Sequence, residues 1–189
     1  MRNQAVTARG HVVGVVSDTH GLLRDEAVAV FQGSDWIVHA GDIGDDEILE
    51  RLREIAPVAA VRGNNDHGPW ASRLPRTHRL EVGGVCVFVI HDLAELAIDP
   101  VAIGVDVVVC GHSHQPVIER RAGVLFVNPG SAGPRRFQLP ISLARLAIIR
   151  EKVDAELMML GAGSGGPPRR MSTAREAPHA MRGRRDRQA

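Results

Sequence analysis

Hydrophobic residues in the first half of the chain occur in short runs rich in β-branched side chains. The runs Val12–Val16, Trp36–Ala40 and Val58–Val61 are the length of buried strands and too short for buried helices. Between them lie longer segments that mix apolar and charged residues. This alternation predicts strands joined by helices, the pattern of an α/β fold.

Two of the intervening segments have the pattern of amphipathic helices. The first covers residues 25–32 and is ended by Gly33; the second covers residues 46–55, with Asp45 at its N-cap. In the second segment the apolar residues fall on one face, at Ile48, Leu49, Leu52 and Ile55. Each helix therefore has one side to pack against a sheet.

Strand patterns dominate the second half of the chain. His78–Val82 and Val85–Ile90 flank Gly83-Gly84, which predicts a tight β-hairpin. After helical residues around Leu93–Ala97, five further strands are predicted at Val107–Cys110, Val117–Arg120, Val124–Val127, Ser142–Ile149 and Lys152–Met159. So many strands with few helices predict two sheets packed face to face, with the helices outside.

Composition sets the domain boundaries. The 189 residues are 44% hydrophobic and 24% charged, typical of one globular domain, but only 3% are aromatic, so Val, Ile, Leu and Ala must build the core. We expect a polar lead-in over residues 1–10 and a folded domain over residues 11–160. Residues 161–189 are rich in glycine, proline and arginine and poor in large apolar residues, which predicts a disordered basic tail.

Net charge and the lack of targeting signals limit the kinds of partner and the compartment that we expect for the protein. The net charge is +1, yet residues 161–189 hold seven arginines against two acids, so the domain itself is mildly acidic. This argues against a nucleic-acid-binding surface on the folded body. No apolar run approaches the ~20 residues of a membrane span, and the N-terminus lacks an apolar signal core. Cys86 and Cys110 lie inside apolar runs, as buried reduced thiols do, so we expect a cytoplasmic protein with no membrane partner.

Five of the predicted strands end on side chains that bind metal ions. In chain order, these side chains are Asp18 and His20, then Asp42, Asn64, His91, and finally His112 and His114. Any one of them alone is better explained as a hydrogen-bonded residue at a strand end. Their recurrence favours a shared site, because strands of an open α/β sheet deliver their last residues to one edge. Oxygen and imidazole ligands without thiolate suit Mn²⁺, Fe²⁺, Co²⁺, Zn²⁺ or Ni²⁺.

The motifs DTH, GD, GNND, a strand-end His and GHSH, in that order, resemble the calcineurin-like metallophosphoesterases, and their small prokaryotic subgroup in particular. His39-Ala40 before Gly41-Asp42, Arg62 before Gly63-Asn64, and the segment 128–131 add to the resemblance. It covers about residues 11–160 and implies a four-layer αββα sandwich of two mixed sheets, with a dimetal site at the sheet rim.

The resemblance also implies a ligand assignment. One metal ion would take Asp18, His20, Asp42 and His114; the other would take Asp42, Asn64, His91 and His112. Asp42 would bridge the pair, and a hydroxide between the metals would attack phosphorus. Among the metals that fit, the family points to Mn²⁺.

Two departures from the family pattern concern proton transfer and orientation. Larger family members have a proton-donating His directly after the ligand Asn, where this chain has Asn65, and an amide cannot be a general acid. Asp66 or His67 could replace it, although His67 is also read as a surface residue. Asp92 follows His91 where the family usually has Gly. It could alter the loop after the ligand or orient His91, and we expect a shifted substrate preference rather than a lost site.

The remaining candidates are supporting residues. His39 is expected either to hydrogen-bond near the metals or to hold its strand end. Asn128 and Ser131 could touch phosphate or form a turn, since Asn-Pro-Gly-Ser is a turn sequence.

Three functions are compatible with these residues. The leading prediction is a dimetal phosphoesterase that cleaves phosphodiesters, and also phosphomonoesters, of a small substrate. A protein-binding scaffold of the same fold is the second; the retromer subunit with this fold is the precedent, but it has lost part of the ligand set that this chain keeps. A cyclic-nucleotide or nucleotide-pyrophosphate hydrolase is the third, although no pair of nucleobase-stacking side chains is visible in the sequence. A homodimer is an expectation from relatives.

Overall fold

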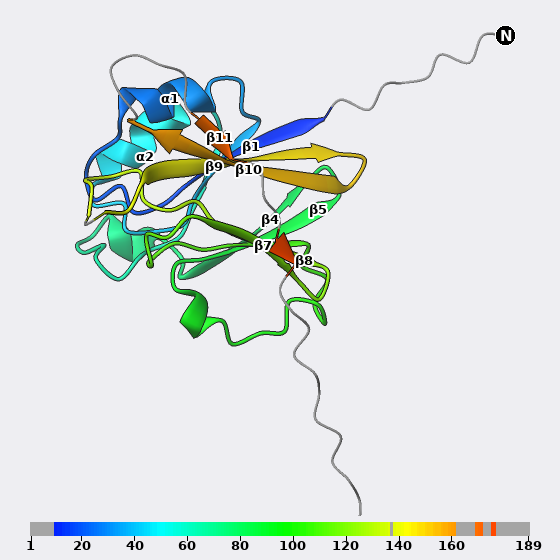
Figure 1. Cartoon of the computed structure of the whole chain (residues 1–189). Coiled ribbons are helices and arrows are strands. Elements are labelled where there is room, and N and C mark those ends of the chain that lie inside the picture. Colours follow the sequence, from blue (N-terminus) through cyan, green and yellow to red (C-terminus); the bar gives the residue numbers. More distant parts are fainter. Residues whose placement is uncertain (1–9, 137, 162–168, 172–174, 177–189) are drawn as a thin grey trace, which may run out of the picture.

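The computed structural model describes residues 10–136, 138–161, 169–171 and 175–176. Two mixed six-stranded sheets pack face to face (Figure 1). The first has the order β11-β10-β9-β1-β2-β3, and its strands are β1 (His11–Val16), β2 (Trp36–His39), β3 (Val58–Ala60), β9 (Ile141–Ile149), β10 (Lys152–Leu160) and β11 (Arg169–Met171). The second has the order β12-β7-β8-β6-β5-β4, and its strands are β4 (Thr77–Val82), β5 (Val85–Ile90), β6 (Val107–Val109), β7 (Val117–Arg121), β8 (Val124–Asn128) and β12 (Arg175–Glu176).

Each sheet contains a block of three parallel strands, at one edge of the first sheet and in the centre of the second. In the first sheet β1, β2 and β3 run parallel, and in the second β5, β6 and β8 do so. The carboxyl ends of parallel strands lie at the same edge of a sheet, so each sheet collects the segments that follow these strands at one rim. The hairpin partners β4, β7, β9 and β10 complete the sheets in antiparallel pairing.

Apolar side chains on the facing sides of the sheets form the main core. Along β1, Val13 and Val15 face the second sheet and meet residues such as Val87, Val109 and Val127. Val16, next along the strand, faces the other way, as the two-residue period of a strand requires. The predicted sandwich of two sheets is therefore confirmed.

The outer layers of the sandwich differ. Helices α1 (Asp25–Phe31) and α2 (Asp46–Arg53) cover the first sheet, where Phe31, Leu49 and Leu52 are fully buried (Figure 1). The predicted N-cap is present: the Asp45 carboxylate accepts a hydrogen bond from the Glu47 amide. Over the second sheet lies a loop with the one-turn 3₁₀ helix η2 (Leu93–Glu95), so the helix expected over Leu93–Ala97 is shorter and tighter. A further 3₁₀ turn, η1 (Ala71–Arg73), precedes β4.

The segment expected to be a disordered tail departs from that expectation at five residues. Residues 169–171 form β11 beside β10, and residues 175–176 form β12 beside β7. Backbone hydrogen bonds at a sheet edge need no apolar side chains, so a low-hydrophobicity argument does not detect such strands. The rest of residues 162–189, and residues 1–9 of the lead-in, lie outside the described residues.

The expectation for the two cysteines is also met. Cys86 and Cys110 are buried free thiols, and burial raises their pKa to about 11 and about 12 respectively. Within the part of the chain that the structure describes, no helix has the length and apolarity needed to cross a membrane.

Candidate metal centre

The loops that follow the parallel strands β1, β2, β5 and β6 are joined in pairs by backbone hydrogen bonds. The Asp18 amide donates to the Gly41 carbonyl at 3.0 Å, and the His20 amide donates to the Asp42 carbonyl at 3.0 Å. These bonds continue the β1–β2 pairing beyond the strands. In the second sheet the Gly111 amide donates to the carbonyl of His91 at 2.9 Å. Main-chain bonds thus fix the loops that carry the predicted ligands.

Five of the seven predicted ligands have a left-handed backbone conformation. Their φ angles lie between 46° and 66°, at Asp18 (55°), His20 (46°), Asp42 (53°), His112 (66°) and His114 (57°). A non-glycine residue in this region costs about 1 kcal/mol or more and persists only where the surroundings enforce it. Such residues concentrate at functional sites, so the backbone gives evidence independent of side-chain chemistry.

Two glycines allow the loops to approach one another. A Cβ at Gly63 would overlap the backbone and carboxylate of Asp42, and a Cβ at Gly111 would overlap the hydroxyl of Ser17. Because these contacts join the ends of different strands, a larger residue at either position would force the ligand loops apart. The GNN and GHSH motifs therefore need glycine for packing.

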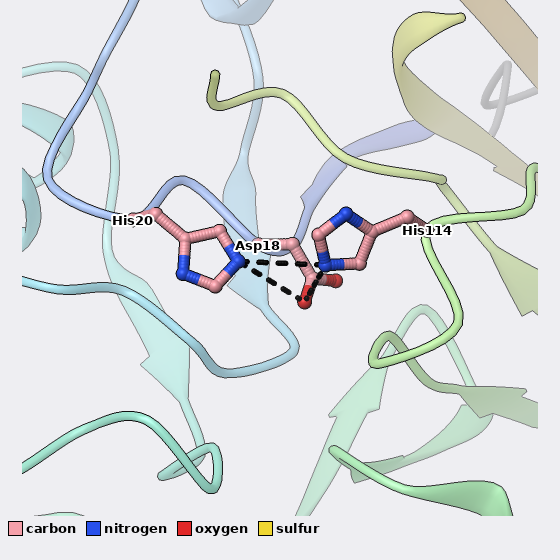
Figure 2. Close-up of side chains that lie close together, drawn as sticks. All are labelled: Asp18, His20 and His114. Atoms are coloured by element: carbon pink, nitrogen blue, oxygen red, sulfur yellow. Dashed lines mark hydrogen bonds and ion pairs between the residues drawn. The ribbon is translucent and has the colours of Figure 1, made fainter. Parts of the chain in front are cut away.

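The first cluster of ligand-type side chains consists of Asp18, His20 and His114 (Figure 2). His114 Nε2 lies 3.1 Å from Asp18 Oδ1, and His20 Nε2 lies 3.4 Å from His114 Nε2. His20 Nε2 is also 3.9 Å from both Asp18 Oδ1 and Asp42 Oδ2. Asp18 is fully buried and the two imidazoles point toward its carboxylate, as ligands around one cation do.

The second cluster contains Asp42, Asn64, His91 and His112. Asn64 Oδ1 lies 3.0 Å from His91 Nε2 and 2.9 Å from His112 Nδ1. His91 Nε2 is 3.4 Å from Asp42 Oδ1, the other carboxylate oxygen from the one that faces His20. Asp42 thus lies between the two clusters, with one oxygen toward each.

His91 is held with its coordinating nitrogen toward this cluster. Its Nδ1 lies 2.7 Å from the carbonyl oxygen of Ala40, so Nδ1 carries the proton and donates, and Nε2 is left to face Asp42 and Asn64. Burial by itself lowers the pKa of His91, but the Asp42 carboxylate and the Ala40 carbonyl outweigh burial and raise that pKa above its ordinary value. The same Nδ1–H to carbonyl bond orients metal-binding histidines generally.

Asn65 has a clear role in the structure, although it is not an acid. Its backbone amide donates to Asp42 Oδ1 at 2.8 Å and its side-chain amide donates to Asp42 Oδ2 at 2.6 Å. Burial tends to raise the pKa of Asp42, yet the contacts with His91 and Asn65 hold that pKa well below its usual value. Asn65 therefore clamps the central carboxylate in its ionised form.

One buried atom shows that this donor set fits a metal ion. Asp18 Oδ1 is inaccessible to solvent and accepts no hydrogen bond, although a buried carboxylate oxygen without a partner is costly. Its nearest neighbours are the imidazole nitrogens of His114 and His20. Carboxylate, imidazole and amide oxygen donors around one point suit a divalent transition metal, which would supply the missing positive partner.

The two candidate proton donors differ in their surroundings. Asp66 is buried, and both its oxygens accept backbone hydrogen bonds, from the amide of Gly44 at 2.9 Å and the amide of Gly63 at 2.8 Å. These bonds make Asp66 a brace between the GD and GNND loops. His67 is exposed and lines the pocket beside the ligands, where it can reach a bound molecule.

His39 supports the loops from beneath. Its Nδ1 accepts from the Gly41 amide at 3.2 Å, so Nε2 carries the proton and donates to the Thr19 hydroxyl at 2.9 Å; that hydroxyl in turn donates to the Ile43 carbonyl. Complete burial lowers the pKa of His39 to about 3, so the ring is neutral. Of the two expectations for His39, the contacts support the structural one.

Asp92, Asn128 and Ser131 also have defined contacts. Asp92 Oδ2 lies 3.8 Å from Nε2 of His112, so its carboxylate faces His112 and not His91 as the sequence suggested. Asn128 donates to the Gly111 carbonyl at 2.7 Å, and Ser131 donates to the Asp18 carbonyl at 2.9 Å. Asn128 and Ser131 brace ligand-bearing loops in these contacts.

A pocket of about 390 Å³ opens beside the second cluster. Asn64, His91 and His112 line it. Two cations line it as well: Arg62, named from the sequence only as part of the family resemblance, and Arg76, which the sequence did not single out. Arg76 lies 3.6 Å from Glu95, whereas the half-buried guanidinium of Arg62 has no ion-pair or hydrogen-bond partner among the described residues. Nothing in the sequence distinguishes Arg62 from a solvent-exposed arginine except its place directly before Gly63-Asn64.

Comparison with known proteins places this geometry in a family. Residues 12–151 match the model of the calcineurin-like phosphoesterase superfamily domain. A probable metallophosphoesterase of Methanocaldococcus jannaschii is 36% identical over 162 residues, covering 78% of this chain and 80% of that protein. The phosphodiesterase YfcE of Escherichia coli is 30% identical over 160 residues, covering 69% of this chain and 84% of the relative.

Among solved structures, wild-type Vps29 of Entamoeba histolytica complexed with Zn²⁺ has the same fold. The TM-score is 0.69 with 24% sequence identity, and the match covers 85% of this chain and 98% of Vps29. At this identity the similarity shows the fold alone. With the family model spanning most of the described domain, the chain belongs to the calcineurin-like phosphoesterase superfamily.

Proposed function

We propose that the protein is a dimetal-dependent phosphodiesterase that acts on small phosphoesters, with Mn²⁺ as the working metal. The observation that carries the proposal is the position of Asp42, with one carboxylate oxygen 3.9 Å from His20 and the other 3.4 Å from His91. A carboxylate between two sets of nitrogen and oxygen donors is the arrangement that two neighbouring metal ions need. Homologues named phosphodiesterase support the choice of reaction.

The side chains of this chain would hold the ions in two groups. Asp18, His20 and His114 form the first group, and Asn64, His91 and His112 form the second. Asp42, 3.9 Å from His20 and 3.4 Å from His91, would belong to both. The ligand atoms of Asp18, Asp42 and His91 also lie within 4.8 Å of one another. Bound there, divalent ions supply Lewis acidity and a water molecule of lowered pKa. Asn65 keeps Asp42 oriented, and the Ala40 carbonyl accepts from Nδ1 of His91, which directs Nε2 inward.

The pocket beside the second group suits a phosphoryl group. The guanidinium of Arg62, which has no partner among the described residues, lines it, and a planar cation with several N–H donors fits phosphoryl oxygens. His67 is the candidate for protonating the leaving oxygen, because Asp66 already accepts two backbone bonds.

The test is a metal-dependent assay with a matched variant. Protein treated with chelator should have no turnover of bis(p-nitrophenyl) phosphate and should regain it with Mn²⁺. Asp42→Asn should lower kcat/KM by roughly 1,000-fold or more, because the amide loses the charge that both ion sites need. Asp99→Asn is the control: Asp99 is an exposed carboxylate that accepts from the Val101 amide at 3.0 Å, and it should match the wild type. Equal rates for Asp42→Asn and the wild type would refute the proposal.

The alternative is a non-catalytic scaffold, since several solved structures with this fold are Vps29. The retained set of seven ligand-type side chains, five of them in strained backbone conformations, favours the enzyme. Stoichiometric capture of a protein partner that is unaffected by chelation, together with no turnover at any metal, would decide for the scaffold.

A further inference from the structure

A second pocket lies next to the first, on the outer face of the second sheet. Its volume is about 210 Å³, and we call it the Phe126 pocket. The side chains that give it its character are Leu93, Gln115, Val117, Glu119, Arg121 and Phe126. Asp92 and His112 line both this pocket and the one beside the ligands, so a molecule bound at the metal centre has the Phe126 pocket directly beside it.

Strand β7, which forms one wall of the pocket, has an apolar residue on its solvent-facing side, where a polar residue would be expected. Val117, Glu119 and Arg121 alternate along β7 and share its outer face, because the side-chain period of a strand is two. The intervening Ile118 is buried between the sheets, whereas Val117 is 40% exposed. The wall therefore offers an aliphatic surface at the metal-centre end of β7, followed by two charged side chains.

The floor of the pocket offers a flat surface. Phe126 is the cross-strand partner of Glu119, and the guanidinium carbon of Arg121 lies 4.8 Å from the centre of the Phe126 ring. Arg121 also forms an ion pair with Glu119, so its planar group is fixed over the ring. A guanidinium held in this way presents its other face for stacking on a second aromatic ring.

We infer that the Phe126 pocket binds a planar aromatic group attached to the phosphorus of the substrate. Its aliphatic wall, stacked guanidinium and polar rim of Gln115 and Glu119 match a ring with an apolar face and polar edges, such as a nucleobase or a substituted phenyl ring. This inference rests on the proposed phosphodiesterase function, and it narrows the substrate to aryl or nucleoside diesters.

The geometry of displacement at phosphorus indicates which ester group enters. The attacking and leaving oxygens are in line, so the leaving group points away from the ligand side chains toward the mouth of the site. The groups retained on phosphorus lie to the sides. Asp92 and His112 line both pockets, so the Phe126 pocket adjoins the predicted ligands, and it should hold the retained ester group rather than the leaving group.

The experiment compares two diesters that share one leaving group. Bis(p-nitrophenyl) phosphate and methyl p-nitrophenyl phosphate both release p-nitrophenolate and differ only in the retained group. In Mn²⁺-loaded protein, Val117→Asp should lower the ratio of their kcat/KM values by about tenfold, because a charged carboxylate replaces the apolar wall. The methyl ester, which has no ring to place in the pocket, should lose less of its kcat/KM than the aryl ester.

Ile149→Asp is the matched control. Ile149 is the last residue of β9, next to the hairpin turn, and is 55% exposed. The substitution likewise replaces an exposed β-branched apolar side chain by a carboxylate, but far from the strand ends that carry the predicted ligands. It should leave the ratio unchanged. An unchanged ratio in Val117→Asp, with normal turnover of both esters, would overturn the aromatic site and leave the proposed function standing.

A binding measurement separates the inference from the enzyme activity. In chelator-treated protein, diphenyl phosphate should shift the NMR methyl signals of Val117 and Leu93, and dimethyl phosphate should not. If no ester is turned over but these shifts occur, the proposed function fails and the aromatic site stands. If neither compound, or both, shifts these signals, the aromatic site is refuted.

Discussion

The two ends of the sheets use the same unusual backbone conformation for different purposes. Eight described non-glycine residues have positive φ, and five of them are predicted ligands at the carboxyl ends of the parallel strands. The other three, Ala122, Arg150 and Glu151, lie at the opposite end, in two-residue turns that close the β7–β8 and β9–β10 hairpins. There the left-handed conformation matches the twist of the strands, as in type I′ turns.

This contrast separates structural strain from functional strain. At the turns the choice of residue is less constrained, because these side chains are not among the predicted ligands, and asparagine or glycine would relieve the strain. At the end of the sheets that carries the predicted ligands (the ligand end), substitution by asparagine or glycine cannot relieve the backbone strain, because the proposed metal centre needs a carboxylate or an imidazole at each position. The site therefore keeps a conformational cost of about 1 kcal/mol or more per residue that packing elsewhere must offset.

The largest expected effect is the pH dependence of stability that comes from His39, the buried histidine beneath the loops that carry the predicted ligands. Burial lowers the pKa of His39 to about 3, from an ordinary value of 6.5. Between these two values the unfolded chain binds a proton that the folded chain does not, so the free energy of unfolding falls as pH falls from 6.5 toward 3, by roughly 5 kcal/mol over the whole window. Denaturant titrations of chelator-treated protein between pH 7.5 and pH 5 measure this slope.

His39→Asn removes the titrating ring and keeps an amide oxygen near the position of Nδ1, where it can accept from the Gly41 amide, but it is too short to replace the bond to the Thr19 hydroxyl. The variant should be less stable at pH 7.5 and should lose less stability on acidification than the wild type. Identical pH slopes for the two proteins would show that His39 does not titrate as its burial implies.

The next prediction compares a glycine-to-alanine substitution in the closely packed ligand end with the same substitution in an open hairpin turn. Gly63→Ala places a methyl group into Asp42, and displacement of a catalytic group by an ångström can cost about 100-fold in rate. Gly123→Ala is the counterpart: Gly123 has φ of 88° in the β7–β8 turn, and an added Cβ meets nothing within 4 Å. It should cost about 1 kcal/mol of stability and leave kcat/KM unchanged. Equal losses of activity in the two variants would remove the distinction between the ends.

Much of the fold, and the placing of ligand-type residues at one end of the strands, could be predicted from the sequence. The strand runs, the Gly83-Gly84 hairpin and the seven ligand-type residues all follow from local patterns, because a buried strand and its final residues leave a short, recognisable signature. The clustering of strand ends also follows, since parallel connections bring them to one edge. Left-handed backbone at Asp18 or His114 does not follow, because it depends on the neighbouring loops.

The parts that sequence did not predict are contacts between distant segments. Asn65 was read as a missing acid, and only the folded chain shows that it clamps Asp42, 23 positions away. Asp92 was assigned to its neighbour His91, but a strand-end turn directs it to His112. Arg121 and Phe126 lie on adjacent strands, so their stacking appears only once the β7–β8 register is known.

A smaller effect is expected at that reassigned carboxylate. Asp92 Oδ1 accepts from the Ala94 amide at 2.9 Å, which fixes the carboxylate, while Oδ2 faces His112. Asp92→Asn keeps an acceptor for Ala94 and loses the negative charge near the imidazole. We expect metal affinity to fall by about tenfold, the lower end of the range for groups that orient a ligand. Calorimetric titration with Mn²⁺ measures this, and Asp99→Asn, with its similar turn contact, should bind as tightly as the wild type. Unchanged affinity in Asp92→Asn would leave Asp92 with only its capping role.

The smallest effect tests the turn end. Ala122 has φ of 49° and is followed by Gly123, so Ala122→Asn creates Asn-Gly, the most favourable pair for a type I′ turn. Asparagine tolerates the left-handed region better than alanine, and the variant should gain about 0.5 kcal/mol in the free energy of unfolding. Denaturant titration at neutral pH measures the gain, and the assay with bis(p-nitrophenyl) phosphate should match the wild type. A loss of stability would mean that the turn conformation is not what limits this position, whereas a gain accompanied by altered turnover would mean that strain at the two ends is coupled through the sheets.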